Sequence, residues 1–290
     1  MVRWYLTILI AVVACHGPFG TAPFDFKGKI ALVTGGSRGI GLTIASELLS
    51  NGVRGITIVG VNVGKGTSAA KSLNQIFGHG KVIFIPADVG NSSALEDAFK
   101  LSFAHWKGLD IMINNAGIVN EVHPTLAINT NIVGTLQGTY LGFRYMSKSR
   151  GRRGGVILNV ASVYGIEPLL FTPVYSGTKA WVIAFSRVMG LPDYYDYNGV
   201  RVLTLCPGLT DTEILDRVPF ASKILDEFLP GLKERSVQIL NNAPIQSVEV
   251  VGKGAITILG KGESGSVWVV EHEQVPYEVK FPDRESMKKI

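Results

Sequence analysis

Short apolar segments alternate with segments of helical periodicity through most of this sequence, and that alternation restricts the fold more than any other feature. Seven apolar segments read as buried strands: Ile30–Val33, Ile56–Val59, Val82–Ile85, Ile111–Ile113, Val156–Val160, Val200–Leu205 and Val267–Val270. The helical segments are Gly39–Leu49, Lys65–Phe77, Asn91–Trp106, Ala127–Lys148 and Val174–Met189. Strands that are apolar throughout need cover on both faces. The pattern therefore predicts a doubly wound α/β fold with about seven parallel strands and helices on both faces.

The composition agrees with a folded, mildly basic protein. Hydrophobic residues make up 46% of the 290 residues and charged residues 18%, which excludes a disordered chain. The net charge is +5, and the densest basic stretch, Lys148–Arg153, is short and has no interleaved aromatic residues. A solvent-exposed loop or helix end explains it better than a nucleic-acid site, so no nucleic-acid partner is expected.

Cysteine and histidine are poorly placed for metal or disulfide chemistry. The two cysteines, Cys15 and Cys206, are too few for a disulfide framework or a cysteine-rich zinc site. The five histidines are far apart, and none has a partner four residues away. A metal-dependent mechanism is therefore not expected.

The N-terminal residues have the pattern of a secretory leader. Arg3 precedes an apolar run from Trp4 to Cys15, which is long enough for a signal-peptide core and short for a membrane span. We expect residues 1–17 to be a signal peptide, and the protein to be secreted or to reside in the endoplasmic reticulum lumen. An uncleaved N-terminal membrane anchor and a buried terminal element are the alternatives. If the leader is cleaved, no stable membrane span is expected, and the sequon at Asn91 becomes available for glycosylation.

The remainder, residues 23–290, has neither linker nor internal repeat and is expected to form a single domain. The segment 209–240 interrupts the alternation and is apolar and mostly helical. In a doubly wound sheet such an insertion lies over the carboxyl edge of the strands, where ligands bind, so it is predicted to be a lid. A surface helical hairpin is the alternative. The glycine cluster Gly252–Gly265 is expected to lie in loops.

A glycine-rich loop, Thr34–Gly41, follows the first strand and opens the first helix. In that context Gly35 permits a tight turn, Gly39 lets the backbone approach a pyrophosphate, and Gly41 lets the helix pack closely on the sheet. The helix N-terminus then offers N–H groups and a partial positive charge to the phosphates. The loop predicts dinucleotide binding in a Rossmann-type fold.

Three side chains near the fifth strand form a candidate acid–base site. Tyr175 and Lys179 are four residues apart, so a helix places both on one face. An ammonium beside a phenol favours the phenolate and lowers its pKa, which suits a general acid or base. Ser162, just past the fifth strand, can hydrogen-bond a substrate oxygen beside the tyrosine; taken by itself it would be an ordinary turn serine.

Together with Asp88-Val89, Asn114–Gly117, Asn131 and Pro207-Gly208, these motifs occur in the order typical of the short-chain dehydrogenase/reductase family, which the chain resembles from Phe26 to Val279. Within the family it is most similar to NAD-dependent hydroxyprostaglandin dehydrogenases and insect-type alcohol dehydrogenases. The stretches GTYLGFRYMSK and PVYSGTKA carry that similarity.

The resemblance implies a role for each matching residue. Tyr175 would be the acid/base and Lys179 would lower its pKa and hold the nicotinamide ribose. Ser162 would orient the substrate oxygen, and Asn131 would support a water that relays protons to Lys179. The other cofactor contacts implied are Gly35, Ser37, Arg38, Gly39, Ile40, Gly41, Asp88, Val89, Asn115, Pro207, Gly208, Thr210 and Thr212.

The end of the second strand departs from the pattern of NAD-specific members. Gly60 stands where those members have an aspartate that bonds the ribose 2′-hydroxyl. Without that carboxylate nothing repels a 2′-phosphate, and Arg38 could attract one, whereas Asn62 could bond a ribose hydroxyl. The residues lean slightly to NADP(H) and the nearest relatives to NAD(H), so the cofactor is left as NAD(H) or NADP(H).

The function expected is an oxidoreductase that interconverts a secondary alcohol and a ketone. The substrate is expected to be apolar, such as an oxylipin, steroid, isoprenoid or aliphatic alcohol, because the lid segment contributes Leu209, Ile214, Leu215, Val218, Phe220, Ile224, Leu225, Phe228 and Leu229. The resemblance implies a homodimer or homotetramer. The alternative is a secreted binding or storage protein that kept the scaffold without catalysis.

Overall fold

The computed structural model describes residues 23–215 and 222–288, with side chains omitted for 222–224. Within these ranges the strands form one sheet in the order β3-β2-β1-β4-β5-β6-β7-β8. Their bounds are β1 Ile30–Thr34, β2 Gly55–Gly60, β3 Val82–Pro86, β4 Ile111–Asn114, β5 Gly155–Val160, β6 Val200–Pro207, β7 Val267–Val270 and β8 Tyr277–Glu278. Every pairing from β3 to β7 is parallel, and β8 adds a short antiparallel edge. The predicted α/β fold is thus confirmed, and β8 is the addition.

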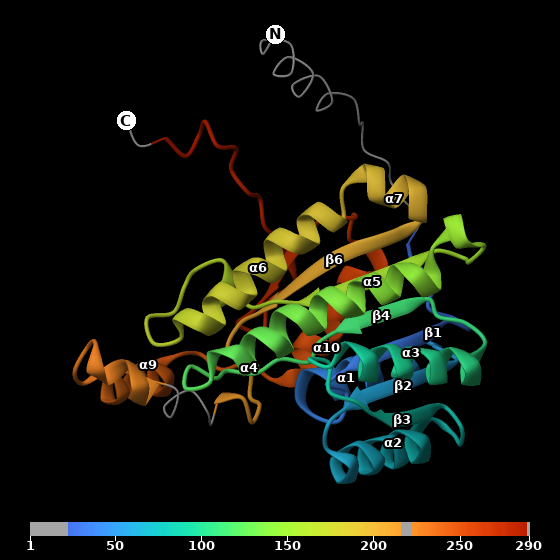
Figure 1. The fold of residues 1–290 in the computed structure, drawn as a ribbon, viewed down its shortest axis with the longest axis horizontal. Coiled ribbons are helices and arrows are strands. Elements are labelled where there is room, and N and C mark those ends of the chain that lie inside the picture. The colour runs from blue at the N-terminus through green and yellow to red at the C-terminus, as the bar shows by residue number, and fades with distance from the viewer. Residues whose placement is uncertain (1–22, 216–221, 289–290) are drawn as a thin grey trace.

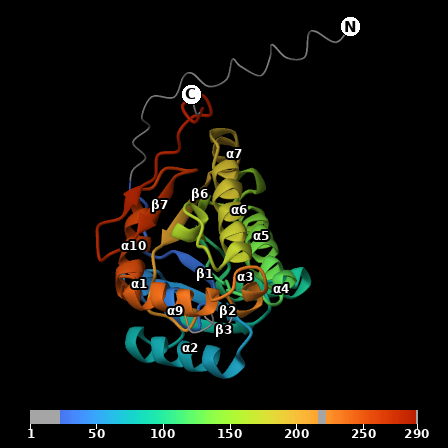
Figure 2. The same ribbon diagram turned by 90° about the vertical axis from the view of Figure 1, so that its left-hand side faces the viewer.

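Helices cover both faces of this sheet (Figures 1 and 2). One layer holds α1 (Gly39–Ser50), α2 (Val63–Phe77) and α10 (Val248–Lys261), and the other holds α3 (Ser92–Trp106), α5 (Gly134–Met146) and α6 (Pro173–Met189). Two buried apolar clusters lie between sheet and helices, one under each layer. A short helix, α7 (Pro192–Asn198), which the periodicity does not reveal, leads into β6.

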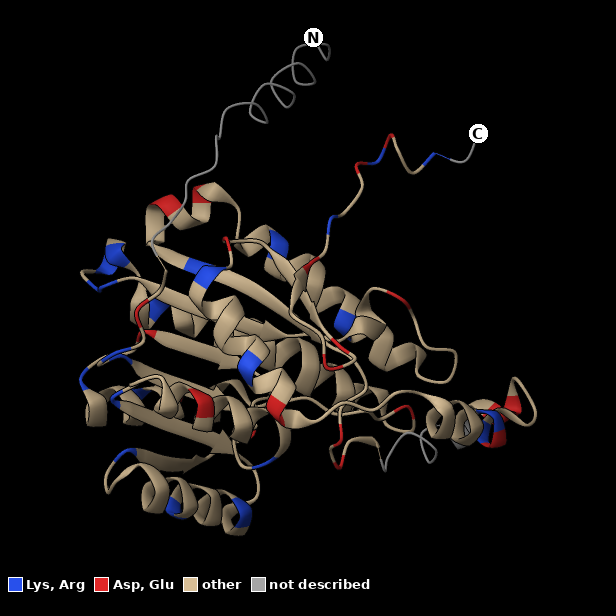
Figure 3. Ribbon diagram, turned by 180° about the vertical axis from the view of Figure 1, so that it is seen from behind, with Lys and Arg blue, Asp and Glu red and all other residues tan. Residues whose placement is uncertain are grey.

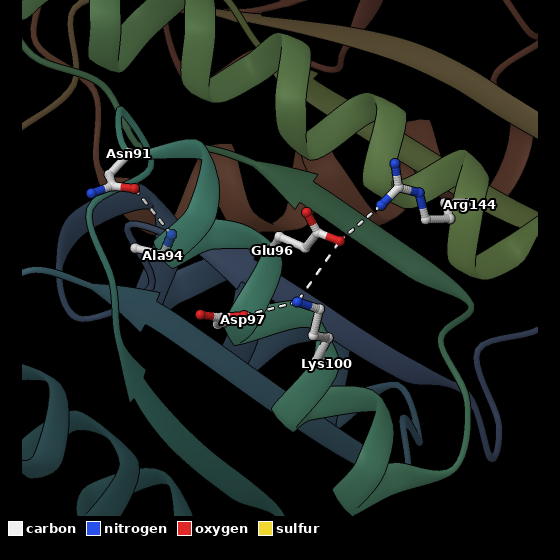
Figure 4. Close-up of polar contacts among 6 residues, drawn as sticks. All are labelled: Asn91, Ala94, Glu96, Asp97, Lys100 and Arg144. Atoms are coloured by element: carbon white, nitrogen blue, oxygen red, sulfur yellow. Dashed lines mark hydrogen bonds and ion pairs between the residues drawn. The ribbon is translucent and has the colours of Figure 1, made fainter.

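The N-cap of α3 is Asn91, as its residue type predicts. Its side chain accepts a hydrogen bond from the backbone N–H of Ala94 at 3.1 Å (Figure 4). The basic stretch 148–153 forms a short 3₁₀ helix and turn on the surface, as expected. Lys and Arg residues are spread over many elements of the ribbon, with Asp and Glu residues among them (Figure 3).

The long helix expected at Ala127–Lys148 is divided. It starts three residues earlier as α4 (Pro124–Ile128), because proline suits a first helical turn. A π-helical turn, η1 (Asn129–Val133), follows, and α5 then runs to Met146. Such π-turns are frequent at functional sites, and this one carries Asn131.

The expectation that the Gly252–Gly265 cluster lies in loops is wrong for most of it. Gly252, Gly254 and Gly260 lie inside the helix α10. At Gly252 the glycine permits close packing of α10 on α1, because a Cβ there would lie 2.6 Å from Cγ2 of Thr43. Gly265, in contrast, does occupy a turn, with a φ of 88°.

The segment after β6 contains the 3₁₀ helix η5 (Ser222–Glu227) and α9 (Leu232–Asn242), at the end of the molecule where α4 also lies (Figure 1). Val218, Phe220 and the side chain of Ile224, which were expected in the lid, lie outside the described residues, as does the expected leader 1–17. None of the helices within the described ranges is both long enough and apolar enough to cross a bilayer.

The packing of α10 on α1 gives a test of the fold. Gly252→Ala forces a methyl group against the branched side chain of Thr43, so we expect it to lower the free energy of unfolding by about 1–3 kcal/mol. Gly260→Ala is the matched control, because a Cβ there has no neighbour within 4 Å in the described part of the chain. It should be neutral or stabilising by up to about 1 kcal/mol, the helix propensity of alanine over glycine. Urea denaturation of both variants measures the difference, and equal effects would contradict the packing described.

Candidate active site

A cavity of about 1060 Å³ opens at the carboxyl edge of the sheet. The loop after β1 and the ends of β2 to β6 form its walls, together with α6 and the start of the segment after β6. Nearly all the predicted site residues line it: Gly35, Ser37, Arg38, Gly39, Ile40, Asp88, Val89, Asn115, Ser162, Tyr175, Lys179, Pro207, Gly208, Thr210 and Thr212. Gly41 and Asn131 are buried and are not among the residues that line the cavity.

The glycine loop has the shape that a pyrophosphate requires. Gly35 and Gly39 have φ values of 65° and 52°, in the left-handed region that favours glycine. A Cβ on Gly41 would lie 2.5 Å from the Gly35 carbonyl oxygen, so this position also requires glycine. The N-cap residue of α1, Arg38, makes no side-chain capping hydrogen bond, and Gly39 and Ile40 in the first turn line the cavity, so N–H groups of this turn remain for a ligand. The residues present therefore fit a dinucleotide.

Asn115, at the end of β4, braces this loop from the neighbouring strand. Its side-chain amide donates to the carbonyls of Thr34 at 3.0 Å and Gly35 at 3.3 Å. Its backbone N–H donates to the Thr34 hydroxyl at 3.1 Å. These bonds fix the glycine loop relative to the wall that carries the catalytic candidates.

Ser162, Tyr175 and Lys179 come together on one wall of the cavity. Ser162 follows β5, while Tyr175 and Lys179 lie one turn apart on α6. The Lys179 Nζ lies 5.6 Å from the centre of the Tyr175 ring and donates to the Val160 carbonyl at 2.8 Å. The Ser162 side chain favours the ionised form of the Tyr175 hydroxyl and so acts to lower its pKa.

Burial controls the titration of this group. It raises the pKa of Tyr175 to about 12, and the hydrogen bond with Ser162 opposes the rise. Burial also lowers the pKa of Lys179 to about 8. The pKa of Tyr175 is therefore raised, and not lowered as its spacing from Lys179 led us to expect, because the loss of hydration on burial is the largest influence on the phenol.

Hydrogen bonds of Asn131 connect the π-helical turn η1 to α6, the helix that carries Tyr175 and Lys179. Its amide nitrogen donates to the Ile118 carbonyl at 2.9 Å and to the Thr178 hydroxyl at 3.0 Å, and its oxygen accepts from the Ile118 N–H at 2.9 Å. Thr178 immediately precedes Lys179 on α6. Asn131 thus holds the loop after β4 against the helix that carries Tyr175 and Lys179.

Sequence reasoning missed Glu121, a buried residue in the loop after β4. Its two carboxylate oxygens accept the backbone N–H groups of Val174 and Tyr175, each at 2.9 Å. It thereby caps the N-terminus of α6 at Tyr175 itself. Burial raises the pKa of Glu121, and the two hydrogen bonds oppose the rise. More than fifty residues separate these partners, so no local pattern could reveal the contact.

Cys206 on β6 is a second buried contact that the sequence did not indicate. Its sulfur accepts a hydrogen bond from the Ser162 backbone N–H, and burial raises the pKa of its thiol to about 12. The thiol of Cys206 is therefore protonated at neutral pH and a poor nucleophile. Among the described residues no three His, Cys, Asp or Glu side chains gather as metal ligands would.

Beside the wall that carries Ser162, Tyr175 and Lys179, the lining of the cavity becomes apolar. Leu209, Ile214 and Leu215 line the cavity, as expected of the lid, and so do Ile118, Val119, Leu126, Leu169, Leu240 and Val248. Ile214, Leu225 and Leu240 pack in the cluster that includes Tyr175. Phe228 is 81% exposed and Leu229 is also exposed, so the expectation that they face the cavity is wrong: they lie on the outer surface.

At the other end of the cavity from Tyr175 lies Gly60, which by the sequence pattern stands where NAD-specific dehydrogenases carry an aspartate. Gly60 ends β2 and lines the cavity together with Arg38 and Lys65. Asn62, considered as a ribose contact, uses its side-chain oxygen to cap α2, accepting from the Lys65 N–H at 2.9 Å. Arg38, considered as a phosphate contact, forms an ion pair with Glu213.

Comparison with known proteins agrees with this geometry. Residues 29–220 match the family model described as short chain dehydrogenase. The chain is 38% identical over 192 residues to the NAD(+) 15-hydroxyprostaglandin dehydrogenase of Mus musculus, covering 66% of this chain and 71% of that protein. It is 31% identical to alcohol dehydrogenase 1 of Ceratitis capitata, covering 82% of this chain and 94% of that protein.

A solved structure extends the comparison to three dimensions. L-Sorbose reductase from Gluconobacter frateurii, complexed with NADPH and L-sorbose, superposes with a TM-score of 0.70 at 25% identity, covering 86% of this chain and 97% of that chain. The chain therefore belongs to the short-chain dehydrogenase family. It is an oxidoreductase that acts on CH–OH groups of a small molecule and uses a nicotinamide cofactor.

The buried cap at Glu121 predicts a pH dependence of stability. Because its folded-state pKa is raised above the ordinary 4.5, the stability it contributes is present below that value and is lost as the pH rises through the folded pKa. Glu121→Gln removes this titration, although it also sacrifices one acceptor and should be less stable overall. We expect the stability advantage of the wild type over Glu121→Gln to shrink as the pH rises from about 4.5. Urea denaturation at a series of pH values measures this, and a constant difference would contradict it.

Proposed function

We propose that this enzyme interconverts a secondary alcohol and a ketone on an apolar small molecule, with NAD(H) or NADP(H) as cofactor. The observation that carries the proposal is the convergence of Ser162, Tyr175 and Lys179 on one wall of the cavity that the glycine loop closes at its other end. The dehydrogenase relatives favour this reading over the alternative of a non-catalytic binding protein.

The nicotinamide cofactor, when bound, supplies or accepts the hydride. Tyr175 moves the proton at its hydroxyl oxygen: with a pKa of about 12 it is protonated at neutral pH and ready to donate to a substrate oxygen. Ser162 holds the same substrate oxygen through its hydroxyl. Lys179 keeps a positive charge beside the phenol at neutral pH, since its pKa is about 8.

The apolar region beside Tyr175 supports a hydrophobic substrate such as an oxylipin, steroid, isoprenoid or aliphatic alcohol. Its walls come from the loop after β4 and from the lid segment. One polar group interrupts it: Thr172 is 1% exposed, lines the cavity, and has a hydroxyl without a hydrogen-bond partner among the described residues. A second polar group on the substrate would satisfy that hydroxyl.

The proton-transfer role gives a direct test. Tyr175→Phe removes the hydroxyl and keeps the ring, so we expect kcat/KM to fall by about 10²–10⁴-fold. Dinucleotide binding should fall far less than turnover. The readout is the absorbance of the reduced nicotinamide with a panel of apolar secondary alcohols and ketones. Tyr197→Phe is the matched control, because Tyr197 is an exposed tyrosine on α7, and it should keep full activity. Full activity in Tyr175→Phe would overturn the mechanism.

We propose a homodimer or homotetramer as the assembled form. Two large apolar side chains on neighbouring elements are exposed: Tyr140 on α5 and Val188 near the end of α6, which are 49% and 52% exposed. Trp181 and Phe185 of α6 stack beside Tyr140 with ring centres 4.7 Å apart. An apolar surface of this kind marks a contact with another protein chain.

We also propose that the protein enters the secretory pathway, either secreted, retained in the endoplasmic reticulum lumen, or held to a membrane by its N-terminus. The support is the apolar run Trp4–Cys15 and the exposed sequon at Asn91. N-terminal sequencing of the protein isolated from its source is expected to start near residue 18. A mature chain that begins at Met1 would rule out cleavage and leave the anchored form.

A further inference from the structure

Glu213 joins two cations that belong to other parts of the fold. It lies just after β6, at the start of the lid segment. It forms ion pairs with Arg38 of the glycine loop and with Lys65 in the first turn of α2, where the Lys65 Nζ is 2.8 Å from a carboxylate oxygen. All three residues line the cavity, and each side chain is about half exposed.

The ion pairs of Glu213 lie at the end of the cavity where β2 ends in Gly60 and carries no acidic side chain. In dinucleotide folds, the residue about twenty positions after the glycine loop recognises the adenosine ribose, by a carboxylate for a free 2′-hydroxyl or with a nearby arginine for a 2′-phosphate. Here that residue is Gly60, which has no side chain, and Asn62 is occupied as a helix cap. The carboxylate that contacts Arg38 and Lys65 here comes from Glu213, in the segment after β6.

We propose that Glu213 sets the choice between NAD(H) and NADP(H), in favour of NAD(H). This inference rests on the proposed dinucleotide site. A 2′-phosphate carries a charge of about −1.5 to −2, so Glu213 repels it and already neutralises the two cations that would attract it. A free ribose hydroxyl carries no charge and can donate a hydrogen bond to a carboxylate. The positive charge of Arg38, which by sequence leans to NADP(H), is matched in the fold by Glu213.

The test measures recognition of the adenosine ribose with ligands that lack the nicotinamide half of the cofactor. Adenosine 2′,5′-bisphosphate and 5′-AMP differ only in the 2′-phosphate, and their binding to the full chain is measured by calorimetry at low salt. Glu213→Gln keeps the size of the side chain and frees both cations. We expect it to tighten adenosine 2′,5′-bisphosphate by about five- to tenfold, with little change for 5′-AMP. The gain should shrink as salt is added, because the groups are half exposed.

Three variants serve as controls. Glu213→Asp keeps the charge and should keep the wild-type preference. Arg38→Ala in the Glu213→Gln background should remove most of the gain, because it removes a freed cation. Glu96→Gln is the matched surface control: Glu96 pairs with Arg144 at 3.0 Å and with Lys100 at 3.9 Å on α3 and α5, away from the cavity, and should leave the preference unchanged (Figure 4).

The outcomes distinguish this inference from the proposed function. If Glu213→Gln changes the affinity for the two nucleotides equally, or weakens the bisphosphate, Glu213 does not set the preference, while the dinucleotide site stands. If the folded wild type binds neither nucleotide, the proposed cofactor site is wrong and this inference is wrong with it. A thermal melt of each variant establishes that it is folded.

Discussion

The need to cover both faces of a parallel sheet governs the rest of this structure. Strands such as β1 and β5 are buried on both sides, so after each of them the chain returns over a face as a helix. Because the strands from β1 to β7 are parallel, the carboxyl ends of all of them lie at one edge of the sheet. The polar loops that follow the strands therefore lie together at that edge. The cavity, the glycine loop and the catalytic wall all exist because of this constraint.

Buried polar contacts then fix the loops at that edge relative to one another. Asn115 ties the end of β4 to the glycine loop, Asn131 ties the π-turn to α6, and Glu121 caps α6 beside Tyr175. Below them, Asn114 and Asn159 are hydrogen-bonded to each other at 2.8 Å between β4 and β5. In a buried region such bonds have strong geometric demands, because a partner lost there is not replaced by water. They keep the proton-transfer group and the phosphate loop in a fixed relation.

Charge is distributed differently at the two ends of the cavity. At the catalytic end, burial sets the titration of Tyr175 and Lys179, and the same burial keeps Cys206 protonated. At the end near Gly60, the charged groups Arg38, Lys65 and Glu213 are about half exposed and paired, so their influence is electrostatic and sensitive to salt. The first arrangement suits proton transfer, and the second suits discrimination between a charged and an uncharged ribose.

The sequence by itself determined which segments form the parallel strands and most of the helices, where the glycine loop lies, and the spacing of Tyr175 and Lys179. These depend on local periodicity and on backbone conformations that glycine permits. It also marked Gly60 as the place of a missing acid. It could not show that Glu121 caps α6, that Glu213 meets Arg38 and Lys65, or that the glycines of α10 pack against α1. Those contacts join residues far apart in the chain, and only the folding of the sheet brings them within reach. The pKa of Tyr175 was likewise decided by tertiary burial, which residue spacing along the chain does not reveal.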